Sequence, residues 1–431
     1  AWNDETRGSL ALAVELTAEP AEVGRPRVCE REMRIRINVE RDVNAADIDL
    51  GVFVRLHNKL TGGLRKTEDA VAKSSDRMNK RLSLSMKLAG AGAVATAIAA
   101  ASKAIVVSAL EPVRAVQRAQ GELASLGVEN IALVTDMGKK MQRQYAGVTA
   151  DAFVLAAYDI RSGISSLTDE GVAEMTRAAT IVAKATKAVP EQMTSLFATS
   201  FGIFRDQYEQ LSDADFGTKF GDMLSASVQQ FKTDGTQMQA ANESAGKSAT
   251  NMGLRMSEQL TILGQLQATM SGSEAGTALK AFAANSARAD AAFGKMQITA
   301  ENPVRIRILD ENNMMRSVPD ILADMTARYG DTLDAAERFE IQQALGSEEA
   351  IKLVDTLYGQ SGALRDNANA LEQAGASGGV YAENMAKLVD NNWDSKIDLY
   401  SQKIDVIKMS IGEGMLPVLE AAEPAITAIT D

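Results

Sequence analysis

The fold is decided by residues 221–288, GDMLSASVQQFKTDGTQMQAANESAGKSATNMGLRMSEQLTILGQLQATMSGSEAGTALKAFAANSAR. Apolar side chains recur there at steps of three and four, the spacing that places them on one face of a helix. They are Leu224, Val228, Phe231, Met252, Met256, Leu260, Leu263, Leu266 and Met270. After a break, Ser271 and Glu274 have the spacing of a capping box and open a helix that carries Leu279 and Phe282. The stretch contains neither His nor Cys and predicts packed helices.

Composition narrows the function classes. The chain has 431 residues with 45% hydrophobic but only 5% aromatic side chains, 19 Met and 8 Pro, a composition that suits helices. The chain has one cysteine, Cys29, and one histidine, His57. This excludes a disulfide framework within the chain and leaves almost nothing for His-based zinc sites or nucleophilic constellations. We therefore predict no enzyme and no catalytic, cofactor-binding or metal-binding residue. The net charge of −12 argues against a nucleic-acid-binding surface overall, although local DNA contact stays open.

Further helices are predicted on both sides of this stretch. Ile131–Tyr145 is periodic, Thr149 is a candidate N-cap of a helix that closes at Ser162-Gly163, and Val172–Val182 marks another. Pro190 suits the first turn of a fourth helix.

Beyond residue 288 the pattern changes briefly. Val304–Leu309 alternates and leads through DENN into MMRSV, which predicts a small hairpin. A helix then starts at Pro319, and another holds Phe339 and Leu345. Gly346 ends that helix and Ser347 begins the next. We expect a flexible break at Gly375–Gly379. The predicted fold class is all-α, mainly long amphipathic helices, with one or two short strands or a hairpin.

The order of these elements resembles the core of phage tail tape measure proteins, over about residues 56–419. The resemblance rests on five segments in series: a helix like Met223–Met238, a segment like Leu260–Phe282, a turn like Asp310–Ser317, a box like Ala344–Ala350, and a closing box like Ile411–Leu419. The AAYDIRSG box of residues 156–163 is also similar.

The resemblance implies a structural protein that templates assembly of the tail tube, sets tail length, and leaves the tail before DNA passes. It implies contact with tail tube subunits, tail-tip or baseplate proteins and tail assembly chaperones. The expected location is the tail lumen of the virion, and the host cytoplasm during assembly. Tape measure chains commonly continue well past the closing box, whereas this one stops at Asp431. Truncation, a prophage remnant and a core module alone are the alternatives.

We divide the chain into five parts. Residues 1–32 lack periodicity and are either a lead upstream of a natural start at Met33 or a disordered tail. Residues 33–53 hold a short strand, Arg34–Val39, and a linker. Residues 54–127 hold a basic helix and an Ala/Gly-rich apolar helix, 128–379 the helical core, and 380–431 a coiled-coil-like helix and tail.

The basic helix, Val54–Met86, stands out in an acidic chain. Residues 55–87 hold nine Lys or Arg against three acids, a net charge of +6. Its basic side is either a solvated surface or a contact for a tube lumen, DNA or a lipid headgroup surface. Leu88–Ser102 is uncharged but, at about 15 residues, short of the ~20 needed to span a bilayer. The alternative function is a membrane-active protein that inserts through residues 55–110.

An enzyme is a further alternative, because Gly90, Gly92 and Ala95 fit a dinucleotide-binding pattern and Glu111 follows about 20 residues later. That pattern requires a preceding buried strand, and the sequence offers a basic helix instead.

The last long helix is expected at Tyr381–Ser410, stopped by Gly412, Gly414 and Pro417. Large apolar residues follow it at steps of 4, 3, 4, 3 and 4, which is a coiled-coil seam. The seam consists of Trp393, Ile397, Tyr400, Ile404, Ile407 and Ile411. It predicts either self-association or docking onto the core helices.

Overall fold

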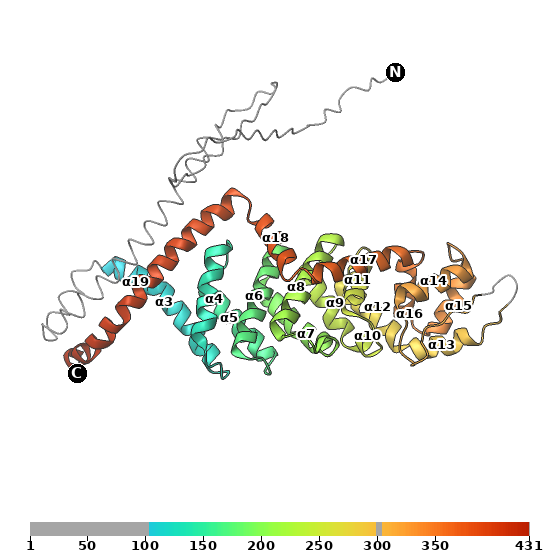
Figure 1. Ribbon diagram of the computed structural model, residues 1–431, viewed down its shortest axis with the longest axis horizontal. Helices are drawn as coiled ribbons and strands as arrows, with labels where there is room; N and C mark the ends of the chain where they lie inside the picture. Colours follow the sequence, from blue (N-terminus) through green and yellow to red (C-terminus); the bar gives the residue numbers. More distant parts are fainter. Residues whose placement is uncertain (1–102, 299–303, 431) are drawn as a thin grey trace, which may run out of the picture. The chain divides into compact units, whose positions relative to one another are not determined.

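A computed structural model describes residues 103–298 and 304–430. They belong to one compact unit, residues 64–431, and they are helical throughout, as predicted (Figure 1). The helices are α3 (Lys103–Ala124), α4 (Ile131–Gln144), α5 (Ala150–Gly163), α6 (Asp169–Thr186), α7 (Pro190–Phe204), η1 (Arg205–Tyr208), α8 (Asp213–Gln230), α9 (Gly235–Ala245), α10 (Ser248–Asn251), α11 (Met256–Leu266), α12 (Gly272–Ala284), α13 (Ser286–Gly294), α14 (Val318–Tyr329), α15 (Ala335–Leu345), α16 (Glu348–Leu357), α17 (Ser361–Gly375), α18 (Val380–Val389) and α19 (Trp393–Thr430).

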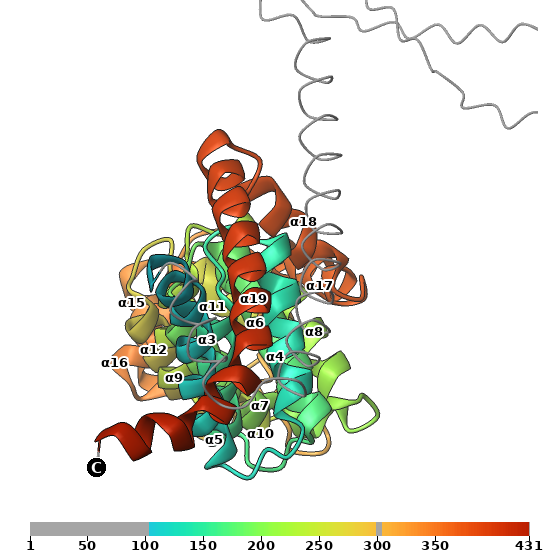
Figure 2. The same ribbon diagram turned by 90° about the vertical axis from the view of Figure 1, so that its left-hand side faces the viewer.

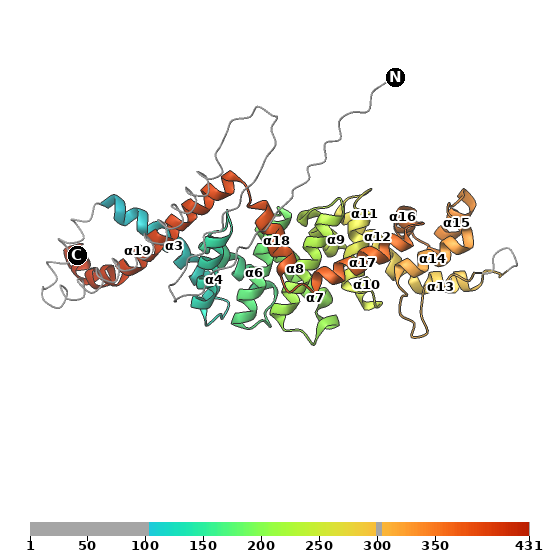
Figure 3. The same ribbon diagram turned by 45° about the horizontal axis from the view of Figure 1, so that its top comes forward.

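The helices up to α16 form an array of two rows. In one row α3, α5, α7, α9, α12 and α16 pack in that order, and in the other α4, α6, α8 and α11 do the same. The last three helices then return along the second row (Figures 1 and 3). Helix α17 packs on α11 and α8, α18 on α8 and α6, and α19 on α4 and α3. We call α17–α19 the C-terminal strap and the helices before α17 the array.

The core between the rows is apolar and holds a cluster of aromatic rings. Phe197 of α7 meets Phe220 of α8 edge to face, with ring centroids 5.0 Å apart. Phe220 lies 6.5 Å from Phe216 in a parallel arrangement, and Phe216 meets Phe201 edge to face at 5.5 Å. The periodic apolar side chains of residues 221–288 join this core, because Leu224, Leu260 and Leu263 among others are fully buried.

Several predicted helix ends are confirmed. The Thr149 hydroxyl accepts from the backbone N–H of Ala152, and Pro190 lies in the first turn of α7. Ser271 and Glu274 form the reciprocal capping box of α12. Gly346 closes α15 with a φ of 65°, a left-handed conformation that favours glycine.

The expectation of one helix over Met223–Met238 is wrong. Helix α8 ends at Gln230, because Phe231 turns into extended backbone and its side chain packs on the core. The Asp234 carboxylate then accepts from the backbone N–H of Gln237 at 2.8 Å and begins α9. A local capping residue thus overrides the apolar spacing.

The predicted hairpin is reduced to one antiparallel bridge between Leu309 and Met315. The Asp310 carboxylate holds the turn by accepting from the backbone N–H groups of Asn312 and Met314. Across the turn, the N–H groups of Asp310 and Arg316 donate to the carbonyls of Met314 and Ile308, each at 2.8 Å, and the N–H of Met315 points outward to the carbonyl of Met252 at 2.8 Å.

The prediction of an uninterrupted helix over Tyr381–Ser410 is wrong as well. Helix α18 ends at Val389, and α19 begins at Trp393 after Asn392, whose side chain accepts from the N–H of Ser395 at 2.8 Å. The predicted stop at Gly412, Gly414 and Pro417 is also wrong, since α19 continues through all three to Thr430. Neither glycine has a positive φ, so the backbone stays helical there.

The remaining N-terminal predictions lie outside the described residues. These are the lead with Met33, Cys29, the strand Arg34–Val39, His57, the basic helix Val54–Met86 and the Ala/Gly-rich run Leu88–Ser102.

Candidate functional site

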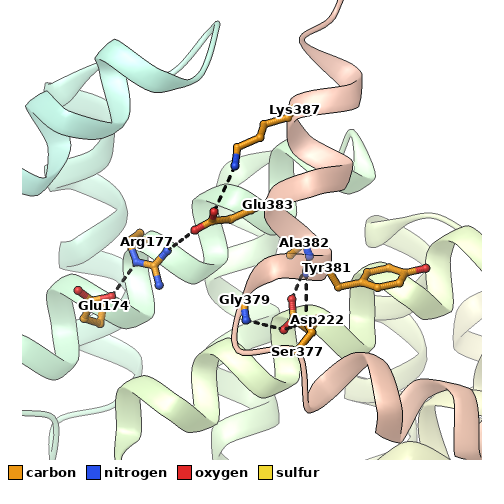
Figure 4. A network of polar contacts seen from close by, with 9 residues as sticks. All are labelled: Glu174, Arg177, Asp222, Ser377, Gly379, Tyr381, Ala382, Glu383 and Lys387. Atoms are coloured by element: carbon orange, nitrogen blue, oxygen red, sulfur yellow. Dashed lines mark hydrogen bonds and ion pairs between the residues drawn. The ribbon is translucent and has the colours of Figure 1, made fainter. Parts of the chain in front are cut away.

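The strap is fastened to the array at joints where a buried carboxylate caps backbone groups. At the joint between α17 and α18, Asp222 of α8 is fully buried. Its carboxylate accepts from the hydroxyl of Ser377 at 2.7 Å and from the N–H groups of Gly379 at 2.7 Å and Ala382 at 2.9 Å (Figure 4). The helix start of α18 is therefore capped by a side chain of the array.

Glycine is required at this joint. Gly378 and Gly379 have φ values of 68° and 91°, which L side chains rarely adopt. The predicted break at Gly375–Gly379 is confirmed, and Asp222 holds its conformation.

The second joint lies where α18 gives way to α19. Asp390, nearly buried, accepts from the backbone N–H of Ala146 at 3.0 Å and forms an ion pair with Lys184 of α6 at 2.7 Å. Lys184 also donates to the carbonyl of Ala146 at 2.7 Å. Three segments far apart in the sequence, the α4–α5 loop, α6 and the strap, thus meet around one charged pair.

Helix α19 is fixed by polar and apolar contacts on one face. The amide of Gln402 donates to the carbonyl of Val148 in the α4–α5 loop and accepts from the N–H of Gly147 at 3.3 Å. Two helical turns further on, Met409 packs with Val113, Val116 and Ala150 in a small buried cluster. Lys139 of α4 pairs with Glu413 of α19 at 2.7 Å.

A charged cleft of about 440 Å³ lies between α4, α6 and α18. Arg177 of α6 joins its walls by pairing with Glu174 at 2.7 Å and with Glu383 of the strap at 3.2 Å (Figure 4). Lys387 of α18 pairs with Glu383 at 3.5 Å. Burial raises the pKa of Tyr145 in this cleft to about 12, and the charge of Glu383 adds to the effect. The Tyr145 side chain, which is buried, therefore stays neutral.

The predicted seam of α19 lies away from these contacts. Trp393, Ile397 and Ile404 are 66%, 61% and 49% exposed, whereas Val406 and Met409 on the other face are buried. Helix α19 does dock onto the core helices, which was one of the two predicted alternatives. It docks with the face opposite the seam, however, and not with the seam itself. The seam residues Tyr400, Ile407 and Ile411 are half-buried.

Within residues 103–298 and 304–430, no group of three His, Cys, Asp or Glu side chains could hold a metal ion. No helix of these residues combines the length and apolarity that a bilayer crossing requires. Glu111 of the dinucleotide-binding pattern is exposed on α3, and the rest of that pattern lies outside the described residues.

Sequence reasoning missed Asp222 and Asp390. Asp222 lies directly before the predicted helix Met223–Met238, where it interrupts a run of apolar and small residues. A carboxylate buried at such a position requires hydrogen-bond donors, and this was the one available signal.

Comparison with known families decides what kind of protein this array belongs to. Residues 131–347 match the family described as "Phage-related minor tail protein". The chain belongs to this family. No curated protein and no solved structure matches the chain.

The match to the minor tail protein family follows the structure closely. It begins with the first residue of α4 and ends at Ser347, the N-cap of α16. The matched residues therefore comprise most of the array, and the strap lies outside them. Asp222 and Lys184, which hold the strap, lie inside.

Proposed function

We propose that this minor tail protein is the tape measure of its tail: a helical structural protein without catalytic activity that tube subunits polymerise around. The observation that carries the proposal is the family match over residues 131–347, together with the ordered segments that end in the Ile411–Leu419 box. Its partners would be the tube, tail-tip or baseplate proteins and assembly chaperones, and its place the tail lumen.

The architecture is compatible with such a role. Each row helix packs against the helices on either side of it in its row, as in repeat arrays whose stability is a sum of local terms. Such an array can open step by step, whereas a globular core opens at once. A fully helical chain of 431 residues would span at most ~650 Å. The compact form described above and an extended form in the tail would then be two states of one chain.

Tail length is the decisive measurement. In the phage gene, 42 or 84 helix-forming residues inserted after Gly359, in an exposed turn between α16 and α17, would add ~63 or ~126 Å if helix measures length. Electron microscopy of assembled tails reads out the increments. A matched insert of 42 residues interrupted by prolines tests whether helix or residue number sets the increment. Tails of unchanged length with both inserts would refute a ruler role.

The membrane-active alternative has its own test. Full-length protein is mixed with anionic vesicles that contain a fluorescent dye. Dye release would support insertion through residues 55–110, and absence of both binding and release would eliminate it.

A further inference from the structure

The outward face of α19 carries a row of exposed apolar side chains. Among the described residues ten large hydrophobic side chains are exposed, and three of them, Trp393, Ile397 and Ile404, lie on this one face. Exposed apolar surface of this kind often marks an interaction site. The helix that carries it is already held by its opposite face, through Gln402 and Met409. Binding of a partner would therefore cost little conformational entropy.

The pattern on this face is that of a coiled coil. Ile397, Ile404 and Ile411 take the a positions of three heptads, and Trp393, Tyr400 and Ile407 take the d positions. The two aromatic d residues have a lysine one turn away over the ring: Lys396 lies 5.7 Å from the Trp393 ring centre, and Lys403 lies 5.9 Å from that of Tyr400.

Core volume favours an antiparallel partner of the same sequence. In a parallel pair equal positions meet, so Trp393 would face Trp393 and Tyr400 would face Tyr400. In an antiparallel pair a residues meet d residues of the other helix. Trp393 then meets Ile411, Ile397 meets Ile407, and Tyr400 meets Ile404. Each aromatic ring lies against an isoleucine, which gives evenly filled layers.

The flanking charges favour the same orientation. With Ile404 at an a position, Lys403 lies at g and Lys408 at e. In a parallel pair g positions meet e positions of the other helix, so Lys403 of each copy would lie next to Lys408 of the other. In the antiparallel pair, Asp394 meets Lys408 of the second copy twice. Lys408 is exposed and pairs only with Asp405 of its own helix, an exposed contact that contributes little. The remaining repulsion is a single Lys403 pair at the two-fold axis, where each ammonium lies over its own Tyr400 ring.

We propose that the outward seam of α19 pairs with the same seam of a second copy of this chain, as an antiparallel two-helix coiled coil with its two-fold axis between Tyr400 and Ile404. The surface is isologous, so it closes as a dimer and adds no further copies.

Cysteine cross-linking of the full chain tests the orientation. Because Cys29 is the only cysteine, the C29S chain is a clean background. Ser401 is exposed and would lie beside its own copy across the axis. Mild oxidation of C29S/S401C should convert most of the protein to a disulfide-linked dimer. C29S/I397C should not cross-link, because Ile397 faces Ile407 in this arrangement. Cross-linking of I397C without that of S401C would show a parallel pair and overturn the proposal.

Light scattering with size-exclusion chromatography tests the surface itself. The wild-type chain should elute with twice the monomer mass of 45.9 kDa at micromolar concentration. I397E/I404E should be monomeric with an unchanged circular dichroism spectrum, which shows that the fold is intact. The matched control L388E changes a side chain that is 72% exposed and off the seam, and should remain dimeric. A monomeric wild type, or a dimer that survives I397E/I404E, would overturn the proposal.

Discussion

The array and the strap both consist of α-helices, but buried polar joints contribute more to the contact between them than to the close contacts within the array. Within the array, α6 and α8 approach closely through small and apolar residues. A Cβ atom on Gly217 would come within 2.5 Å of the Met175 sulfur, and one on Gly221 within 2.9 Å of Val182. Between array and strap, apolar side chains such as Leu371 and Ala386 join the core as well, and Asp222, Asp390 and Gln402 add buried polar joints.

This difference bears on which part can move. Opening an apolar interface costs free energy in proportion to the apolar area that becomes exposed to water. Opening a polar joint costs less, because its groups form hydrogen bonds with water instead. Release of the strap from the array should therefore cost less than separation of the rows. A chain that changes from compact to extended would open first at the strap.

The largest expected effect is in the array. Phe220 is fully buried between Phe197 and Phe216, so F220A should lower the free energy of unfolding by about 3–5 kcal/mol. Chemical denaturation followed by circular dichroism measures it. F339A is the matched control, because Phe339 is 58% exposed, and it should change stability by about 0.5 kcal/mol or less. Equal effects of the two substitutions would mean that the aromatic cluster does not stabilise the array.

A smaller and more local effect is expected at the strap. D222A leaves the Ser377 hydroxyl and the N–H groups of Gly379 and Ala382 without their acceptor, at a cost of about 2–3 kcal/mol. Hydrogen exchange by mass spectrometry should show faster exchange in α17–α19 and unchanged protection in α6–α8. D222N keeps one carbonyl oxygen and should lie between D222A and wild type.

The hydrogen-exchange pattern of D222A can also contradict the distinction between array and strap. If D222A increases exchange in α6–α8 as much as in the strap, the two parts open together and the strap is not a separable element.

The helix ends of the array could be predicted from the sequence because their signals are local. Ser271 and Glu274 need only each other, and Thr149 needs only the next turn. The joints of the strap could not be predicted in this way. The donors to Asp222 lie 155 to 160 residues further along the chain, so no window around it contains them.

The face of α19 that docks was beyond sequence reasoning for a related reason. Two sets of positions on this helix have heptad spacing, the apolar seam and the set of Ser395, Leu399, Gln402, Val406 and Met409. The more polar set docks because Gln402 finds the open backbone groups of Gly147 and Val148. Hydrophobic periodicity shows which face of a helix is more apolar, but it contains no information on polar partners elsewhere in the chain, such as these backbone groups.

The smallest expected effect concerns a polar joint inside the array, and it depends on pH. Glu258 of α11 is almost fully buried and accepts from the N–H of Val318 at 2.7 Å, which caps the start of α14. Burial raises the pKa of Glu258, against the lowering effect of hydrogen bonds and Arg255. The folded chain therefore holds this proton more tightly than the unfolded chain, so the contribution of Glu258 to stability is greatest at low pH and is lost as pH rises through the folded pKa.

E258Q keeps an acceptor for Val318 but carries no titrating group. Its free energy of unfolding, relative to wild type, should increase as the pH rises from that of an unperturbed carboxyl to neutral. Urea denaturation of both proteins across this range measures the difference. E349Q is the matched control, since Glu349 is exposed and pairs only with Lys352. A difference that is constant with pH would mean that Glu258 stays ionised in the folded chain. This joint of the array would then tolerate a buried charge, as the strap joint at Asp390 does with Lys184 beside it.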